Sequence, residues 1–236
     1  MKLDPSFIWT AFVGLLPAIP TTLILTLVSV TCGFLIGTAT ALARMYRIPV
    51  LAQLASSYVT FIRGTPMLVH LLLIYFGLPL AIDALSAQFD LGWNSAKVPM
   101  ITFAFVSFSI TAGAYMSEVV RSGLLAIDRG QMEAALSVGM TVPQALRRIV
   151  FPQAIAAALP NLTNSVIGML HGSTLAFTVS VVDLNAKAQI VASTNWKYFE
   201  AYLAVAIIFW GLTIIIERIA AAIERRISLY SRGGVA

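Results

Sequence analysis

The chain has 236 residues, of which 59% are hydrophobic and only 11% are charged, and its mean hydropathy is +0.89. Soluble domains carry roughly 25% charged residues, so this composition excludes a soluble globular domain and indicates an integral membrane protein. The apolar residues form continuous runs, which favour helices over a β-barrel. The net charge of +5 does not indicate nucleic-acid binding, because the basic residues lie at the ends of apolar runs and are not gathered with aromatic residues on one face.

The apolar runs predict five membrane-spanning helices in a single all-α transmembrane domain over residues 1–236. A bilayer core about 30 Å thick requires about 20 apolar residues per helix. Runs of this kind lie at about residues 21–43, 58–80, 98–117, 160–182 and 199–216. The segment from Phe7 to Pro20 contains Gly14, Pro17 and Pro20, and is therefore expected to be an amphipathic or re-entrant lead-in.

The first span carries small residues at intervals of four. Gly33, Gly37 and Ala41 share one helix face, which would allow another helix to approach closely. The alternative is that glycine is simply common in membrane helices. Cys32 is the only cysteine, so no intrachain disulfide can form.

The basic residues predict the orientation of the chain in the membrane. With five spans, one side receives eleven of the 15 basic residues: Arg44, Arg47, Arg63, Arg121, Arg129, Arg147, Arg148, Arg218, Arg225, Arg226 and Arg232. The other side receives the remaining four: Lys2, Lys97, Lys187 and Lys197. By the positive-inside rule, the N-terminus is predicted outside and the C-terminus in the cytoplasm.

A polar island interrupts the apolar runs between residues 128 and 160. Asp128, with Gln131 three residues on, is the pattern of a capping box and predicts a short helix from Arg129 to Val138. Gly139 suits the left-handed residue that ends such a helix.

A second helix is predicted to follow directly. Thr141 with Gln144 repeats the cap pattern, and Pro143 lies in the first turn, so this helix should start at about Val142. The first helix would expose its apolar residues on one side and would need a partner to cover them. These residues are Met132, Ala135 and Leu136.

The island resembles a known family motif. Glu133-Ala134-Ala135, three residues, Gly139, nine residues and Ile149-Val150-Phe151-Pro152 is similar to the EAA loop of the membrane subunits of bacterial ABC importers, EAA-x3-G-x9-I-x-L-P. The one departure is Phe151 in place of leucine. The segments 61–66 (FIRGTP) and 152–154 (PQA) resemble the branch that takes up polar amino acids.

The resemblance implies a type I ABC importer permease with a cytoplasmic EAA loop over residues 118–159. It also implies that the island couples to a dimer of ATP-binding subunits through Gln131, Glu133, Ala134, Ala135 and Gly139. A second permease subunit, identical or a sibling, and an extracytoplasmic amino-acid-binding protein would complete the assembly in the bacterial inner membrane.

The chain offers no catalytic constellation. It contains no GxxxxGK[ST] phosphate loop, no set of residues at metal-ligand spacing and no serine with a plausible base and acid beside it. We therefore expect a transport subunit that is not itself an enzyme and holds no cofactor, with ATP and Mg²⁺ on the partner ATPase.

Polar residues inside the fourth span are the predicted substrate contacts, because a polar group in lipid is costly unless it faces protein or water. Asn161, Asn164, Gly168 and His171 follow at helical spacing, so they would share one face, which would line a cavity. His70 in the second span could reach the same midplane site. The alternative for each histidine is a bond to a neighbouring carbonyl within the bundle.

Two neighbouring residues join this predicted set through the resemblance. Thr174 lies in the segment 171–178, which resembles histidine-uptake subunits. Ser165 stands where several relatives for cationic amino acids have an acidic residue, so a cationic substrate is disfavoured. The segments 161–165 and 197–206 resemble permeases for cystine and other sulfur-containing amino acids.

Arg63 and Glu118 are predicted near the same membrane boundary on neighbouring spans. They could form an ion pair between helices, or each side chain could extend independently to the interface.

The sequence thus predicts the membrane subunit of an ABC importer that moves a polar amino acid inward by alternating access. The alternative is an ion-coupled secondary transporter or channel that needs no ATPase. The lack of carboxylates in the predicted span cores weighs against ion coupling.

Overall fold

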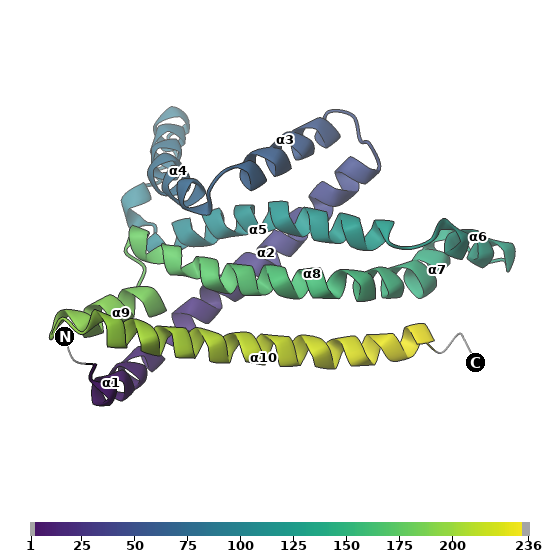
Figure 1. Ribbon diagram of the computed structural model, residues 1–236. Coiled ribbons are helices and arrows are strands. Elements are labelled where there is room, and N and C mark those ends of the chain that lie inside the picture. Colours follow the sequence, from purple (N-terminus) through teal and green to yellow (C-terminus); the bar gives the residue numbers. More distant parts are fainter. Residues whose placement is uncertain (1–2, 233–236) are drawn as a thin grey trace.

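The computed structural model describes residues 3–232, and these residues form a bundle of helices (Figure 1). The predicted all-α fold is confirmed. The α-helices in chain order are α1 (Pro5–Leu15), α2 (Ile19–Met45), α3 (Leu51–Gly64), α4 (Met67–Phe89), α5 (Met100–Leu125), α6 (Arg129–Ser137), α7 (Val142–Ala145), α8 (Phe151–Gly172), α9 (Leu184–Ser193) and α10 (Tyr198–Arg232). Short 3₁₀ segments are η1 (Leu16–Ala18), η2 (Ser95–Lys97) and η4 (Ser173–Val179), and η3 (Leu146–Val150) is a π-helical turn.

The predicted number of spans is confirmed. Within residues 3–232, four segments are long and apolar enough to cross a membrane: Pro5–Met45, Met67–Phe89, Met100–Leu125 and Tyr198–Ile227. The pair Val142–Val179 and Leu184–Ser193 is bent by 54° at its junction, and it gives the fifth span when it is counted as one broken span. The lead-in before residue 21 is helix α1, which continues through η1 into α2 and packs against α9 and α10.

The second predicted span, residues 58–80, is not one continuous helix. The structure divides it at Thr65 and Pro66 into α3 and α4 (Figure 1). A proline disfavours helical backbone at the preceding residue, and Thr65 is extended, with φ −127° and ψ 153°. The apolar run therefore contains a corner, and α4 extends to Phe89 through what was expected to be a loop.

Three other helices run beyond their predicted ends. Helix α5 continues to Leu125, α8 begins at Phe151 and α10 reaches Arg232. The predicted spans ended at charged residues or at Pro160, but a helix can carry charges once it leaves the apolar layer. These extensions bring helical structure to the edges of the polar island.

The α2–α5 seam, defined by Gly33 and Gly37 on α2 facing Ala112 and Met116 on α5, is the closest helix contact. A Cβ added at Gly33 would lie 2.4 Å from the Cβ of Ala112, and one at Gly37 would lie 2.7 Å from the Cβ of Met116. Real Cβ atoms do not approach so closely, so only glycine fits. The small-residue face predicted on the first span is confirmed.

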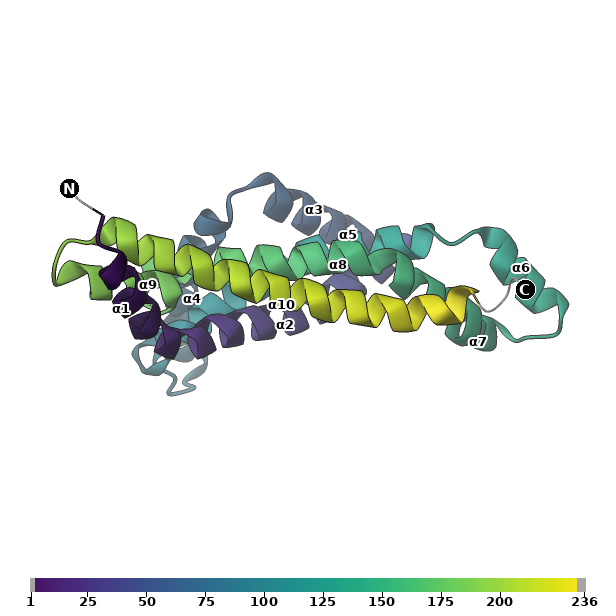
Figure 2. The ribbon, with the colours of Figure 1, turned by 60° about the horizontal axis from the view of Figure 1, so that its bottom comes forward.

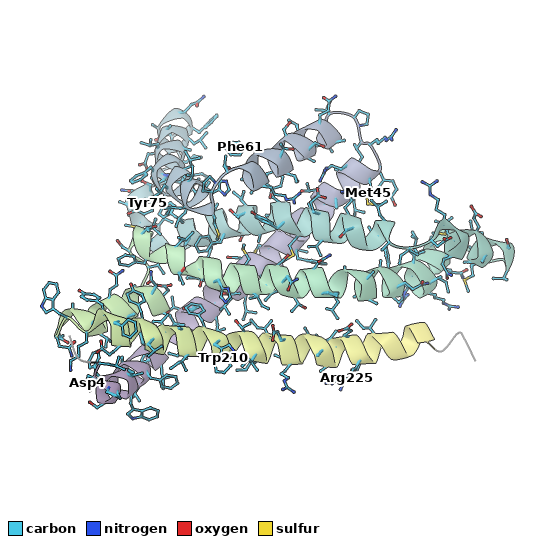
Figure 3. All side chains as sticks on the ribbon, viewed as in Figure 1. Asp4, Met45, Phe61, Tyr75, Trp210 and Arg225 are labelled. Carbon is cyan, nitrogen blue, oxygen red and sulfur yellow. The ribbon has the colours of Figure 1, made fainter. Side chains whose placement is uncertain are left out.

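Different helices form the two ends of the bundle. The N-terminal helix, α9 and the start of α10 lie at one end, and α6, α7 and the end of α10 lie at the other (Figures 1 and 2). At the first end, the Asp4 side chain caps α1 and forms an ion pair with Lys197, in which Nζ lies 2.5 Å from Oδ2. Figure 3 shows Asp4 at this end and Arg225 near the far end of α10.

Candidate functional site

A cavity of about 610 Å³ lies between α5 and α8, at the corner where α3 meets α4. This volume is within the range of small-molecule sites, about 300–1,000 Å³. The residues that line it are Arg63, Met67, Thr111, Ala112, Tyr115, Met116, Glu118, Val119, Ser122, Asn161, Asn164, Ser165, Gly168 and Met169. The cavity thus combines an apolar wall with amide, hydroxyl and charged groups.

Four of the predicted substrate residues meet in this cavity. Asn161, Asn164, Ser165 and Gly168 all line it from α8. Thr163, between them in sequence, does not line the cavity, and the hydroxyls of Thr163 and Ser165 both donate to carbonyl oxygens of their own helix, Leu159 and Asn161, at 2.9 Å. Their role as substrate contacts stays a prediction.

His70 lies behind the cavity wall. It is buried in the first turn of α4, and not near the middle of a span as expected. Its Nε2 lies 2.6 Å from the hydroxyl of Thr65, and its Nδ1 lies 3.2 Å from the hydroxyl of Thr111. It therefore ties the α3–α4 corner to α5 through hydroxyl groups.

His171 and Thr174 lie away from the cavity. The Nε2 of His171 is 3.3 Å from the hydroxyl of Thr213 on α10, and its ring contacts Phe209 edge-on with centroids 5.9 Å apart. Thr174 donates from Oγ1 to the carbonyl oxygen of His171 at 2.8 Å. The structure therefore does not bring His70 and His171 together.

Glu118 forms a cluster with three arginines, which we call the Glu118 cluster: Arg44, Arg63, Arg121 and Glu118. The expected partner, Arg63, places its Nη1 3.9 Å from Oε1 of Glu118. Arg44 on α2 donates to that oxygen at 2.6 Å, and Arg121 donates to Oε2 from Nε at 3.0 Å and from Nη2 at 2.9 Å. Arg44 and Arg121 were not predicted as partners of Glu118, although the spacing of three residues between Glu118 and Arg121 could have indicated the second.

The α6–α7 hairpin, residues 128–145, has the predicted form. Helix α6 covers Arg129–Ser137, and Asp128 accepts a bond from the amide of Gly130 at 2.6 Å. Gly139 is left-handed with φ +84°, and Gln144 accepts from the amide of Thr141 at 2.9 Å. Gln131 does not close the first cap as expected, because its Oε1 accepts from Nε2 of Gln153 on α8 at 3.2 Å.

The hairpin exposes apolar side chains among polar ones. Val138 is 76% exposed and Leu136 is 42% exposed. Ala135 was expected to be exposed with Leu136 but is buried, and Met132 is half-buried. Of the other predicted coupling residues, Gln131, Glu133, Ala134 and Gly139 are exposed, and the coupling role of all of them stays a prediction.

A helical membrane-spanning chain with a cavity between its helices and an exposed hairpin at one end belongs to the class of membrane transport subunits. Residues 29–229 match the model of the family described as binding-protein-dependent transport system inner membrane component. The chain belongs to that family.

Two similar proteins have names that agree with this membership. The chain is 42% identical over 226 residues to the probable amino-acid permease protein YxeN of Bacillus subtilis, covering 96% of both chains. It is 36% identical to the L-cystine transport system permease protein TcyL of the same organism, over 89% of this chain and 85% of that one.

Solved structures match over nearly the whole chain. An amino acid ABC transporter crystallised with histidines is 37% identical, with a TM-score of 0.79 over 96% of this chain and all of the other. A chain of the inward-facing MetNI methionine ABC transporter is only 19% identical but has a TM-score of 0.71, over 95% of this chain and 99% of the other. The fold is that of the type I ABC importer permeases.

Proposed function

We propose that the protein is the membrane-spanning permease subunit of an ATP-driven importer of polar amino acids, and that it works by alternating access. The observation that carries this proposal is the position of the α6–α7 hairpin between α5 and α8, the helices that supply most of the cavity lining. A partner that moves the hairpin would act on both walls. Two ATP-binding subunits, a second permease subunit and an external amino-acid-binding protein would complete the complex.

The contacts near the hairpin support this coupling. A Cβ added at Gly123 of α5 would lie 2.7 Å from the Cβ of Ala158 on α8, so the walls pack tightly just below the hairpin. Gln131 of α6 is bonded to Gln153, and the π-helical turn η3 joins α7 to α8. Such a linked set can transmit a displacement as a movement of whole helices.

The exposed apolar side chains of the hairpin support an ATPase partner at this end. Burying Val138 and Leu136 against another protein would be favourable, because each buried methylene contributes about 0.8 kcal/mol. ATP and Mg²⁺ would be held on that partner.

The distribution of charge supports a hairpin in the cytoplasm and an N-terminus outside. Arg121, Arg129, Arg147 and Arg148 flank or lie within the hairpin region, whereas Lys197 lies at the opposite end with Asp4. Alkaline phosphatase inserted at Asn94 should be active, and phosphatase fused after Arg232 should be inactive. The reverse pattern would contradict this orientation.

Similarity to TcyL makes L-cystine the first substrate to test. The amide groups of Asn161 and Asn164 suit the polar groups of an amino acid.

Purification from the native membrane in mild detergent tests the proposal. A P-loop ATPase should co-purify, and vesicles containing the complex with its binding protein should take up an amino acid only when ATP is supplied. Uptake driven by an ion gradient without ATP would contradict the proposal and favour a secondary transporter or channel.

A further inference from the structure

The carboxylate of Glu118 is already occupied by two of the three arginines around it. Oε1 accepts from Arg44 at 2.6 Å, and Oε2 accepts two bonds from Arg121, at 2.9 and 3.0 Å. Both arginines are within hydrogen-bond range, which is where a charge-assisted bond is strong. Glu118 is thereby held in a fixed position between α2 and α5.

Arg63 has a different environment. Its Nη1 is 3.9 Å from Glu118, beyond hydrogen-bond distance, and its side chain is 48% exposed. Its guanidinium carbon lies 6.0 Å from the centre of the Tyr115 ring, and both residues line the cavity. Of the three arginines, Arg63 is therefore the one outside hydrogen-bond distance of Glu118, and it lines a cavity that a small molecule could fill.

The cluster as a whole is electropositive. It holds three guanidinium groups and one carboxylate, so two positive charges are not compensated within it. A planar guanidinium presents a fork of donors that matches the two oxygens of a carboxylate. The chemistry of this wall therefore suits a ligand with a carboxylate and disfavours a ligand with net positive charge.

The end of α3 holds Arg63 in place. Val59 and Ile62 on the same helix are buried, and Tyr58 donates from its hydroxyl to the carbonyl oxygen of Ile110 on α5 at 2.5 Å. The helix ends at Gly64, just before the corner. A ligand-binding group on a supported helix end loses less freedom on binding than one on a loop.

We propose that the Arg63 guanidinium binds the carboxylate of the transported amino acid in the cavity, while Arg44 and Arg121 keep Glu118 from neutralising it. The proposal rests on the proposed function and adds the group that recognises the substrate. The amides of Asn161 and Asn164, on the opposite wall formed by α8, then remain for the rest of the substrate. An amino acid with a free carboxylate and no net positive charge is the substrate class.

The test uses the complete complex with its ATPase and binding protein in vesicles. ATP-dependent uptake of the twenty proteinogenic amino acids and L-cystine is measured first for the wild-type complex. Arg63→Gln should lower uptake of the best substrate per assembled complex by about ten- to a hundred-fold, because a hydrogen bond to a charged group is lost. Arg63→Lys should lose less, and Arg47→Gln, an exposed arginine beyond the end of α2, should behave as wild type.

A charge-replacement series separates binding from structure. Arg63→Cys is made together with Cys32→Ser, and the purified permease is treated with methanethiosulfonate reagents that attach an aminoethyl, ethyl or sulfonatoethyl group before assembly. Uptake should rank aminoethyl first, ethyl second and sulfonatoethyl last.

Two outcomes overturn the inference alone: unchanged uptake by Arg63→Gln, or any other ranking of the three adducts, equality included. If the wild-type complex takes up no member of the panel with ATP, the proposed function fails and the inference falls with it.

Discussion

Two glycines in this chain, Gly33 in the α2–α5 seam and Gly139 in the α6–α7 hairpin, serve opposite purposes. At Gly33 a side chain has no room, since a Cβ would lie 2.4 Å from that of Ala112, and the backbone there is ordinary helix. At Gly139 nothing lies within 4 Å of an added Cβ, but the backbone has φ +84°. One glycine allows close packing and the other allows a sharp turn.

The contrast separates the frame of the molecule from its docking element. The seam buries its contacts within the chain, so its residues should determine whether the protein folds. The hairpin leaves Val138 and Leu136 exposed, so its residues should determine whether the folded protein engages a partner. Changes in the two regions should therefore affect different measurements.

The largest effect is expected in the seam. Gly33→Leu should destabilise the protein by about 3 kcal/mol, because overpacking forces α2 away from α5. Gly77→Leu on α4, where nothing lies within 4 Å of an added Cβ, is the matched control and should change stability by less than about 1 kcal/mol. Thermal unfolding of the purified permease measures both, and equal losses would remove the distinction drawn for the seam.

The second-largest effect is expected in the hairpin, on stimulation of the partner ATPase. Gly139→Val requires a β-branched residue at positive φ, which costs roughly 1–2 kcal/mol and should reshape the turn. Stimulation of the partner ATPase should be lost, while the melting temperature changes less than for Gly33→Leu. Gly139→Asn, which tolerates the left-handed region, should retain most of the stimulation. Normal stimulation by Gly139→Val would contradict the docking role.

The cavity should respond in a third way, with effects on transport alone. Asn164→Leu should reduce uptake about tenfold or more, since an unpaired polar group of the substrate costs roughly 1–3 kcal/mol. Thr163→Val, one residue away but bonded to its own helix, should reduce uptake much less. Assembly with the ATPase is measured in parallel by co-purification. A harmless Asn164→Leu would place the substrate elsewhere.

The smallest effect is expected at the opposite end of the molecule, at Asp4. The bond from Lys197, with a further bond from Ser6, holds the pKa of the Asp4 carboxyl well below its usual range. Because the folded-state pKa is depressed, the bond contributes stability above about pH 4, the ordinary value of an aspartate, and that contribution is lost as the pH falls further.

Asp4→Asn should therefore lower the melting temperature slightly at pH 7, and the difference from wild type should shrink below about pH 4. Asp90→Asn, at the exposed C-terminal end of α4, is the control. A difference that stays constant with pH would show that the ion pair is not its source.

Local features of this fold could be predicted from the sequence. The helix at Arg129–Ser137 and the left-handed Gly139 depend on caps and turn residues within a few positions. The glycine face of α2 and the meeting of Asn161, Asn164 and Gly168 depend only on helical periodicity. Each of these is decided by the chain near the residue concerned.

Features that depend on distant segments could not. Helices α4 and α5 are both apolar enough to span a membrane, yet the apolar stretch of α4 is 11% buried and that of α5 is 61% buried. Composition does not distinguish a peripheral helix of the bundle from a central one. The bond from Arg44 to Glu118 joins residues 74 apart, and His171 turns to Thr213 because of how α10 packs beside α8. Pro66 could have indicated the corner after Thr65, but the apolar run around it favoured one continuous helix.

The central claim is that movement of the hairpin opens the cavity to one side of the membrane at a time. The most direct test is side-specific labelling of that cavity. Gly168→Cys, made with Cys32→Ser, places one thiol on the cavity wall where a side chain has room. In vesicles containing the full complex, a membrane-impermeant maleimide should label this thiol from one side without nucleotide and from the other side when ATP is trapped. Labelling from the same side in both states, or from both sides in one state, would contradict the account.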